Sequence, residues 1–363
     1  MLDKILLYFS IIYILCFLLM CIISQFIIIK FSNKVFNILC SIFIMACCIV
    51  AFYSTDKSEG ESGWDLNRYY ADINAMRGKD IKYAMHNGMY KNTILTNLLF
   101  FFVSRLNNNA WLQVFSTAVS LMIFFHIIIS IKTEEKYKLS TVLFYILLYF
   151  SLLSFATILL CVRWIMAISF CTLGFYKNKN GTGVIKEIIC CVVAVFIHYG
   201  VIYYLFVRIL SIFHSKIPSY LLLGIMLLIP LVGRLTINFP YLSSIYNKFI
   251  GYKQLTFSDV RVFIVELSVL ILYCICWYIV YKKKKESNVF YRNCLAAIIG
   301  VLPVYHLFSR MLGIYTFVNC DGIMEIIDDK SNYLIKVAFS IIIIGMFAYQ
   351  LVFMKSFWRF TII

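Results

Sequence analysis

Long apolar runs constrain this chain more than any other feature. Hydrophobic residues make up 63% of its 363 residues and charged residues only 14%, whereas about a quarter of a soluble domain is charged. We therefore expect an all-α, polytopic integral membrane protein, because a backbone in lipid must satisfy its own hydrogen bonds. The runs that read as membrane helices, or as large parts of them, are Ile5–Ile29, Leu112–Ile131, Leu221–Val232, Val262–Tyr281 and Ile341–Met354.

Basic residues in short loops set the orientation, because such loops stay in the cytoplasm. They lie in Lys30–Lys34, Lys132–Lys138, Lys177–Lys186, Lys282–Arg292 and a tail with Lys355 and Arg359. We place the acidic segments Thr55–Lys91 and Cys320–Lys330 outside. The same bias explains the net charge of +16 without nucleic acid as a partner, and the lipid bilayer is the expected surrounding.

Hydrophobic length predicts about nine full spans and two partial or re-entrant ones. They form a single membrane domain, residues 1–363, with an outer loop at residues 54–92. Thr93–Leu106 is too short to span comfortably and is interpreted as a half-helix or an interfacial segment on the outer side. Val184–Leu210 has basic residues at both flanks, so we expect a re-entrant pair of half-helices turning around His198-Tyr199-Gly200. One long tilted helix is the alternative.

A few ionisable residues lie inside or beside the apolar runs, where a charge costs free energy and normally marks a functional site. They are Arg163, His198, Arg234, Glu266, His306 and Arg310. Most of them gather toward the outer side in this threading, so we expect several segments to aim polar groups at one outward cavity. Pro303 is expected to kink the Asn293–Phe317 span beside His306 and Arg310.

Simpler explanations exist for some of these residues. Arg163, alone at a helix end, would suit snorkelling to lipid headgroups. Glu266 would suit pairing with Arg261 or Arg234. Arg310 lies deeper, which favours a functional role.

The residue types in this cavity suit a phosphate-bearing lipid. Arginine binds phosphate through two parallel hydrogen bonds and stays charged in a low dielectric. Histidine titrates near neutral pH and can take a proton from a sugar hydroxyl. The outer-loop motif Asp65-Leu-Asn-Arg68-Tyr69-Tyr70 adds Asp65 as a second candidate base, with Arg68 and Tyr69 spaced to orient a polar ligand.

Motifs of several other enzyme classes are missing from the sequence. It has no GxxxxGK(S/T), no GxGxxG and no HExxH, so nucleotide hydrolysis, dinucleotide redox chemistry and zinc proteolysis lack support. The thirteen cysteines include no C-x-x-C pair and lie mostly in apolar runs, so we interpret them as small membrane hydrophobes. We expect no cofactor and no metal.

With these motifs in this order, the chain resembles the EpsG family of bacterial membrane proteins, which is related in role to the Wzy-type polymerases of O-antigen and capsule. The segments with the likeness are Asp65–Tyr69, Arg163–Ala167, Phe196–Gly200, and Ser309-Arg310 leading to Tyr315. Two residues depart from the family's pattern, since Trp164 stands where glutamine is usual and Gly200 where serine is common. Both bear on the sugar contacted more than on the reaction class.

The resemblance implies a metal-independent glycosyltransferase of the bacterial cytoplasmic membrane. Such an enzyme joins undecaprenyl-diphosphate-linked repeat units at the outer face to make capsule, exopolysaccharide or O-antigen. It implies that Arg163 and Arg310 hold the diphosphate, that His198 or Asp65 assists the acceptor hydroxyl, and that Arg68 and Tyr69 position sugar. Fixed arginines would stabilise the charge that develops on the leaving diphosphate. A chain-length regulator and a flippase are the protein partners it implies.

Three other classes of function stay open. A flippase for lipid-linked oligosaccharide also needs arginines for a diphosphate, but along a path across the membrane. Here the inner half is nearly free of charge, which favours an outward-facing enzyme. A membrane acyltransferase often has a histidine near an early helix, and Ile5–Tyr53 contains none. An assembly partner without chemistry is disfavoured by the buried charges, although ion pairs can serve packing alone.

Overall fold

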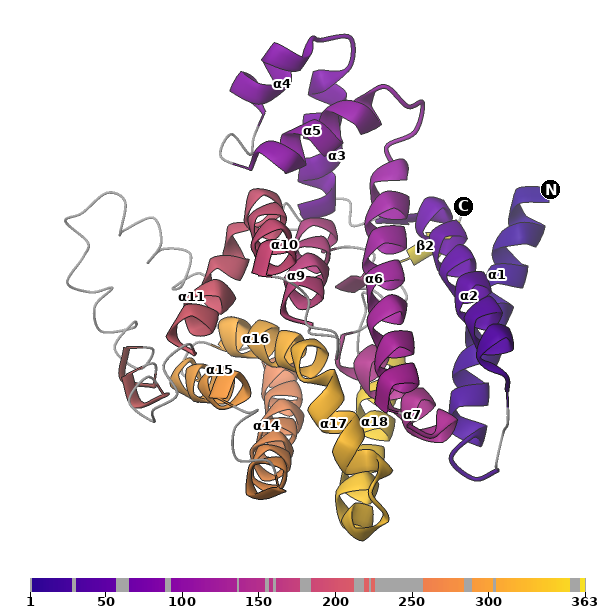
Figure 1. Cartoon of the computed structure of the whole chain (residues 1–363). Helices are drawn as coiled ribbons and strands as arrows, with labels where there is room; N and C mark the ends of the chain where they lie inside the picture. The colour runs from indigo at the N-terminus through magenta and orange to yellow at the C-terminus, as the bar shows by residue number, and fades with distance from the viewer. Residues whose placement is uncertain are drawn as a thin grey trace. The chain divides into compact units, whose positions relative to one another are not determined.

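The chain is described by a computed structural model that divides into two compact units (Figure 1). Unit 1 comprises residues 1–202 and 347–363, and unit 2 comprises residues 203–346. The residues that the structure describes are 2–27, 31–56, 65–88, 93–135, 137–153, 157–158, 161–176, 184–211, 219–221, 223–225, 257–283, 289–302, 305–352 and 360–362.

Four apolar helices form one part of unit 1. They are α1 (Leu2–Ile23), α2 (Asn33–Tyr53), α6 (Trp111–Glu135) and α7 (Leu139–Leu152). Helix α2 packs against α1 and α6, and α7 also contacts both α1 and α6. Their core is aromatic: the ring of Phe43 lies 4.5 Å from that of Phe17, 5.8 Å from Phe125 and 5.5 Å from Phe150.

Three short helices form what we call the cap of unit 1, at the top of Figure 1. They are α3 (Asp65–Met76), α4 (Ile81–Asn87) and α5 (Ile94–Ser104), and α5 packs against both of the others. Gly78 permits the turn between α3 and α4 because its φ of +71° suits glycine. The Asp80 side chain then caps α4 by accepting a hydrogen bond from the Tyr83 amide. Helix α5 lies within Thr93–Leu106 and confirms the short helix predicted there.

Two further helices of unit 1, α9 (Val162–Phe175) and α10 (Val184–Ile197), lie below the cap in Figure 1. Helix α9 packs against α6 and α10, and α10 also contacts α5 of the cap. Helix α10 ends at Ile197, and a 3-10 turn, η1 (Tyr199–Val201), leads into α11 (Ile202–Leu210), which belongs to unit 2 from Tyr203 on. The predicted break at His198 is thus confirmed, whereas the re-entrant path of the two halves stays a prediction.

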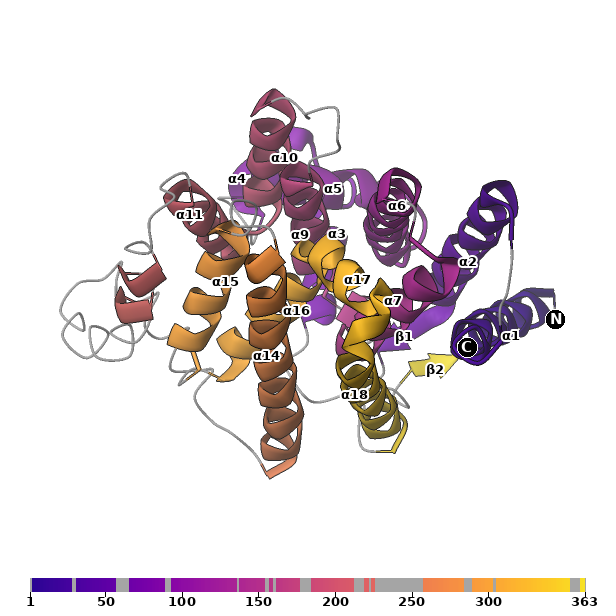
Figure 2. The same ribbon diagram turned by 60° about the horizontal axis from the view of Figure 1, so that its bottom comes forward.

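Unit 2 is a group of helices packed around α14 (Figure 2). They are α14 (Phe257–Lys283), α15 (Val289–Gly300), α16 (Tyr305–Val318), α17 (Cys320–Asp328), the 3-10 turn η2 (Lys330–Asn332) and α18 (Tyr333–Val352), whose last residues belong to unit 1. Helix α14 contacts α15, α16 and α17. The ring of Tyr273 lies 5.0 Å from that of Tyr315, and its hydroxyl shares a 2.5 Å hydrogen bond with the hydroxyl of Thr316.

Two predictions for unit 2 are wrong. The single kinked span at Asn293–Phe317 is two helices, because α15 ends at Gly300 and α16 begins at Tyr305. Pro303 itself lies outside the described residues. The acidic outer loop at Cys320–Lys330 is largely the helix α17, which buries Ile323, Met324 and Ile327. Its acidic residues fall between these apolar positions, so charge alone concealed the helical period.

A two-stranded antiparallel ribbon joins distant parts of unit 1. Strand β1 (Ser54–Asp56) pairs with β2 (Phe360–Ile362), with Thr55 opposite Thr361. Paired strands lie about 5 Å apart, so both must be on the same side of a membrane. The predicted outer loop at residues 54–92 and the predicted cytoplasmic tail therefore cannot both be right.

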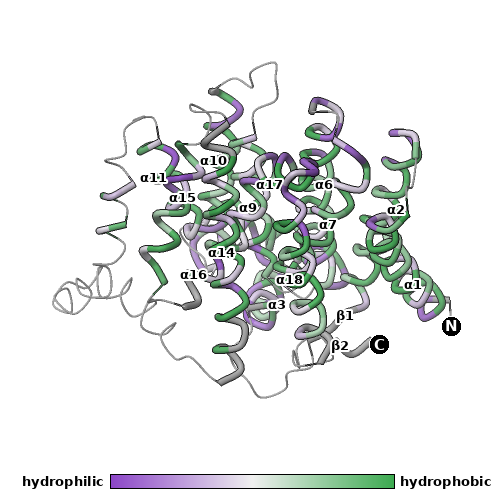
Figure 3. Tube along the Cα trace, turned by 90° about the horizontal axis from the view of Figure 1, so that it is seen from below, coloured by the Kyte–Doolittle hydropathy of each residue, from purple (hydrophilic) through white to green (hydrophobic). Residues whose placement is uncertain are grey.

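The hydropathy of the helices matches a multi-pass membrane protein. Among the described residues, four helices are long and apolar enough to cross a bilayer, at Asp3–Ile23, Asn33–Tyr53, Trp111–Glu134 and Lys330–Tyr349, and six shorter ones are also apolar. Figure 3 shows hydrophobic residues along most of α1 and α2. Large apolar side chains such as Phe9 and Leu15 are exposed, as lipid contact requires. The all-α fold is confirmed for the described helices, and the count of nine spans stays a prediction.

Candidate functional site

Among the described residues of unit 1, Arg163 is a buried cation. It is the second residue of α9, as predicted for the start of a helix, and only 7% of its surface is exposed. Its Nε donates to the Thr96 hydroxyl at 3.2 Å, and its Nη2 donates to the Thr93 hydroxyl and to the Ile197 carbonyl, both at 3.1 Å. These contacts fix the guanidinium in one orientation, which a side chain snorkelling to headgroups would not have.

The two threonines that hold Arg163 come from the start of α5. Residues three apart share a helix face, so Thr93, which precedes the helix, and Thr96 both point to the arginine. Both are about 1% exposed. The sequence analysis missed them. The available signal was a pair of hydroxyls three residues apart at the edge of an apolar segment.

The cap brings the motif Asp65–Tyr70 to the same place. The guanidinium carbon of Arg163 lies 5.9 Å from the centre of the Tyr69 ring, within reach of a cation–π interaction. Tyr69 is 3% exposed and its ring lies 5.4 Å from that of Phe100 on α5. We call Arg163, Thr93, Thr96, Ile197 and Tyr69 the Arg163 cluster.

The other residues of the motif have different surroundings. Asp65 is the first residue of α3, four residues before Tyr69 and so on the same helix face; its side chain lies outside the described residues. The side chain of Arg68 is exposed. Tyr70 donates a 2.5 Å hydrogen bond to the side-chain oxygen of Gln113 on α6, and burial raises the pKa of Tyr70, which keeps it a donor. This bond fixes α3 against α6.

His198 stands at the end of α10, directly after Ile197 of the Arg163 cluster. Its backbone is extended (φ −153°, ψ 118°), and its Nδ1 accepts a 2.9 Å hydrogen bond from the Gly200 amide. An amide N–H can only donate, so Nδ1 accepts through its lone pair and has no proton of its own. The neutral ring therefore has its proton on Nε2. A Cβ on Gly200 would lie 2.9 Å from both Cε1 and Nδ1 of this ring, so glycine permits the contact.

The remaining candidates belong to unit 2 or lie outside the described residues. Arg310 is half-buried on α16, and its neighbour Ser309 donates a 2.6 Å hydrogen bond to the buried carboxylate of Glu266 on α14. Arg234 and the side chains of Arg261 and His306 lie outside the described residues, as does the predicted pairing of Glu266 with an arginine. A single cavity shared by Arg163 and Arg310 therefore stays a prediction.

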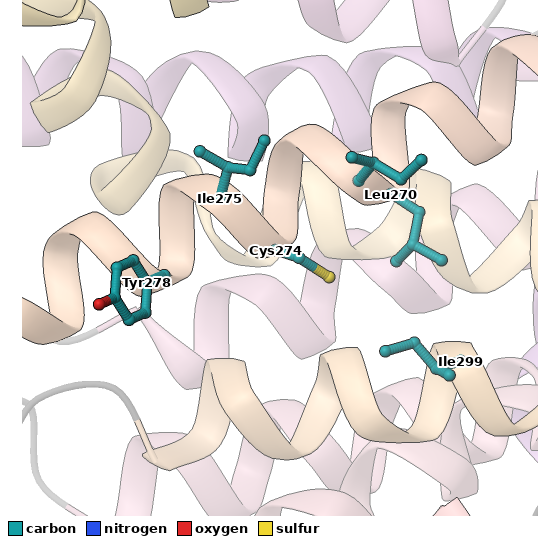
Figure 4. Close-up of a pocket in the computed structure, with 6 residues that line it drawn as sticks. Leu270, Cys274, Ile275, Tyr278 and Ile299 are labelled. Atoms are coloured by element: carbon teal, nitrogen blue, oxygen red, sulfur yellow. The ribbon is translucent and has the colours of Figure 1, made fainter.

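Unit 2 also has an apolar groove between α14 and α15 (Figure 4). Its walls are Leu270, Ile271, Cys274, Ile275, Tyr278 and Ile299. None of the described residues that line it is charged, so it suits hydrocarbon and not phosphate. Among the described residues, no three His, Cys, Asp or Glu side chains gather as a metal site would require.

No curated protein and no solved structure matches this chain. A family model described as the EpsG family matches residues 57–362, a range that includes the cap, the Arg163 cluster, His198 and Arg310. Because this match covers most of the chain, the protein belongs to the EpsG family.

Proposed function

We propose that this protein is a polysaccharide polymerase of the bacterial cytoplasmic membrane, a glycosyltransferase that joins undecaprenyl-diphosphate-linked repeat units at the outer face. The observation that carries the proposal is the Arg163 cluster. There, a buried and fixed guanidinium lies beside an aromatic ring and a helix break. Family membership supports a polymerase-like membrane protein.

The proposed glycosyl transfer requires a fixed positive charge near the leaving diphosphate. In the proposed step, an acceptor hydroxyl oxygen bonds to C1 of the donor sugar while the bond from C1 to the diphosphate oxygen breaks. The hydroxyl proton passes to a base, and undecaprenyl diphosphate leaves with the bonding electron pair. Negative charge grows on the diphosphate, so a preorganised arginine lowers the barrier. We assign Arg163 to this role, with Arg310 as the second diphosphate ligand.

The geometry of His198 favours Asp65 as the base. A neutral imidazole can accept a proton on Nε2 only if its own proton is on Nδ1. That proton would then point at the N–H of Gly200, and the hydrogen bond between them would be lost. As the Nε2–H tautomer, His198 is instead a hydrogen-bond donor to a phosphate or sugar oxygen. Asp65 then takes the acceptor proton, and Arg68 and Tyr69 position sugar. The scheme uses no metal and no cofactor.

The outer face follows from the loops that flank the cap. Residues 54–92 lie between α2 and α6, and the far ends of these two long apolar helices are at the basic loops Lys30–Lys34 and Lys132–Lys138. Two basic loops favour a position of the cap outside the cell membrane, whereas the tail has only Lys355 and Arg359. In this proposal the cap lies outside, and the tail lies on the same side because β2 pairs with β1.

Arg163 also has a structural role that the test must separate from a catalytic one. Its contact with the Ile197 carbonyl neutralises the end of α10, where the helix dipole is negative. A variant that only disturbs folding lowers protein abundance, whereas loss of a diphosphate ligand lowers activity per molecule. The competing class is a flippase for the same lipid-linked oligosaccharide.

The experiment deletes the gene in its native host and restores it as wild type, Arg163→Ala or Arg163→Lys. Surface glycan is resolved on gels, lipid-linked intermediates by mass spectrometry, and protein abundance by immunoblot. We expect Arg163→Ala to leave single repeat units at the outer leaflet without long polymer, at normal abundance. Repeat units trapped on the inner leaflet would identify a flippase, and full polymer length with Arg163→Ala would refute the proposal.

A further inference from the structure

We infer that Thr96 is a positioning residue whose one hydroxyl fixes both Arg163 and the helix end that presents His198. The inference rests on the proposed function and deepens it. Thr96 is 1% exposed, so it reaches the substrate only through these two residues.

The hydrogen bonds of Thr96 have a defined direction. Its Oγ1 donates to the Ile197 carbonyl at 2.9 Å, because a carbonyl has no hydrogen to give. A lone pair of the same oxygen is then directed at Nε of Arg163, which donates to it at 3.2 Å. The hydroxyl therefore cannot rotate without losing both bonds, and it holds the guanidinium and the carbonyl in one arrangement.

The Ile197 carbonyl needs such a partner. In a continuous helix it would accept from the amide of Val201, four residues later. Here the Val201 amide instead donates to the His198 carbonyl at 3.3 Å. Thr96 and Arg163 take the place of the missing helical donor, which stabilises the extended backbone of His198 and so the position of its ring.

Loss of this hydroxyl should therefore disturb two functional groups at once. Arg163 would keep its bonds through Nη2 but could swing about them, and the helix end would lose one of its two donors. A displacement of about 1 Å in a positioning residue can cost about a hundredfold in rate. Neither effect should change the affinity of the enzyme for the lipid tail of the substrate.

The test compares Thr96→Val with Thr96→Ser and with the control Thr117→Val. Thr117 on α6 is equally buried, and its hydroxyl has no hydrogen-bond partner among the described residues, so the control removes the same atom without a bond. Purified variants in nanodiscs receive the lipid extract of the deletion strain, which contains the accumulated lipid-linked repeat units. Polymer formation gives kcat and KM.

We expect Thr96→Val to lower kcat by about ten- to a hundredfold with KM within about twofold, since only transition-state geometry is disturbed. Thr96→Ser should keep at least half of kcat, and Thr117→Val should match wild type. A kcat of Thr96→Val within twofold of wild type would overturn the inference. If Thr96→Val does not fold, Thr96→Ala, which also removes the hydroxyl, takes its place with the same criterion.

A second measurement does not depend on polymer formation. Hydrogen–deuterium exchange of the amides of Gly200 and Val201, which are bonded to His198, should become faster in Thr96→Val and stay unchanged in Thr117→Val. Unchanged exchange would refute the positioning role. If the wild type forms no polymer while the exchange responds as expected, the proposed function fails and the positioning of His198 by Thr96 stands.

Discussion

The two units each contain a buried polar network built on an arginine, and the two differ in what the arginine contacts. In unit 1, Arg163 bonds to Thr93, Thr96 and the Ile197 carbonyl. In unit 2, Nε of Arg292 donates to Ser219 at 2.7 Å, Ser219 donates to Asn293 at 2.6 Å, and Asn293 donates to Ser211 at 2.9 Å. We call these four residues the Arg292 cluster.

The difference lies in the segments that each network joins. The Arg163 cluster joins the cap motif, the start of α9 and the break at His198, which are three of the four segments that resemble the EpsG family. The Arg292 cluster joins the first turn of α15 to Ser211, the residue after α11, and to Ser219. An arginine in a polar network therefore does not by itself mark a site; the segments that the network joins do.

Substitution of the two arginines should show the largest difference between the two clusters. Arg163→Ala should lower polymer formation per molecule by about 10²–10³-fold, as for loss of a preorganised charge at the reacting group. Arg292→Ala should lower abundance and melting temperature while activity per molecule stays within about threefold of wild type. Quantified immunoblots and gels from the complemented deletion strain check both. An equal loss per molecule in the two variants would contradict the distinction.

His198→Asn should separate the two roles of that residue. The asparagine oxygen can accept from the Gly200 amide as Nδ1 does, but no donor replaces Nε2–H. We expect a loss of about a hundredfold in kcat with little change in melting temperature. Wild-type activity in this variant would mean that His198 serves only as a cap and that the Nε2 donor is not used.

Gly200→Ala should have a smaller effect on the same ring. The added methyl group would lie 2.9 Å from two atoms of the imidazole, so the ring must shift by a few tenths of an ångström or more. We expect about a tenfold loss of kcat. Gly224→Ala is the control, because a Cβ there meets nothing within 4 Å. The idea fails if both variants keep full activity.

Tyr70→Phe should affect stability more than activity. It removes a hydrogen bond to the fully buried side chain of Gln113, at a cost of about 0.5–1.5 kcal/mol. Thermal unfolding in detergent should show a lower midpoint, with polymer formation per folded molecule within about twofold of wild type. Tyr278→Phe, at a ring that is 58% exposed, should leave the midpoint unchanged.

Several features of the fold could be predicted because their causes are local. The short helix at Thr93–Leu106, the start of a helix at Arg163 and the break at His198 follow from hydrophobic length and the charges at the segment ends. The division of Asn293–Phe317 was less accessible, since a proline in an apolar run predicts a kink as readily as an end. The helix α17 was missed because acidic residues were given more weight than the apolar period.

By itself, the sequence determined that this chain is an all-α membrane protein and that Arg163 and His198 stand out from an apolar background. Only the tertiary structure decided that Thr93, Thr96 and Tyr69 are the partners of Arg163. Thr96 lies 67 residues from Arg163 and 101 residues from Ile197 along the chain. Such contacts depend on how α5, α9 and α10 pack, and packing depends on the shape of all their side chains together, which no local pattern encodes.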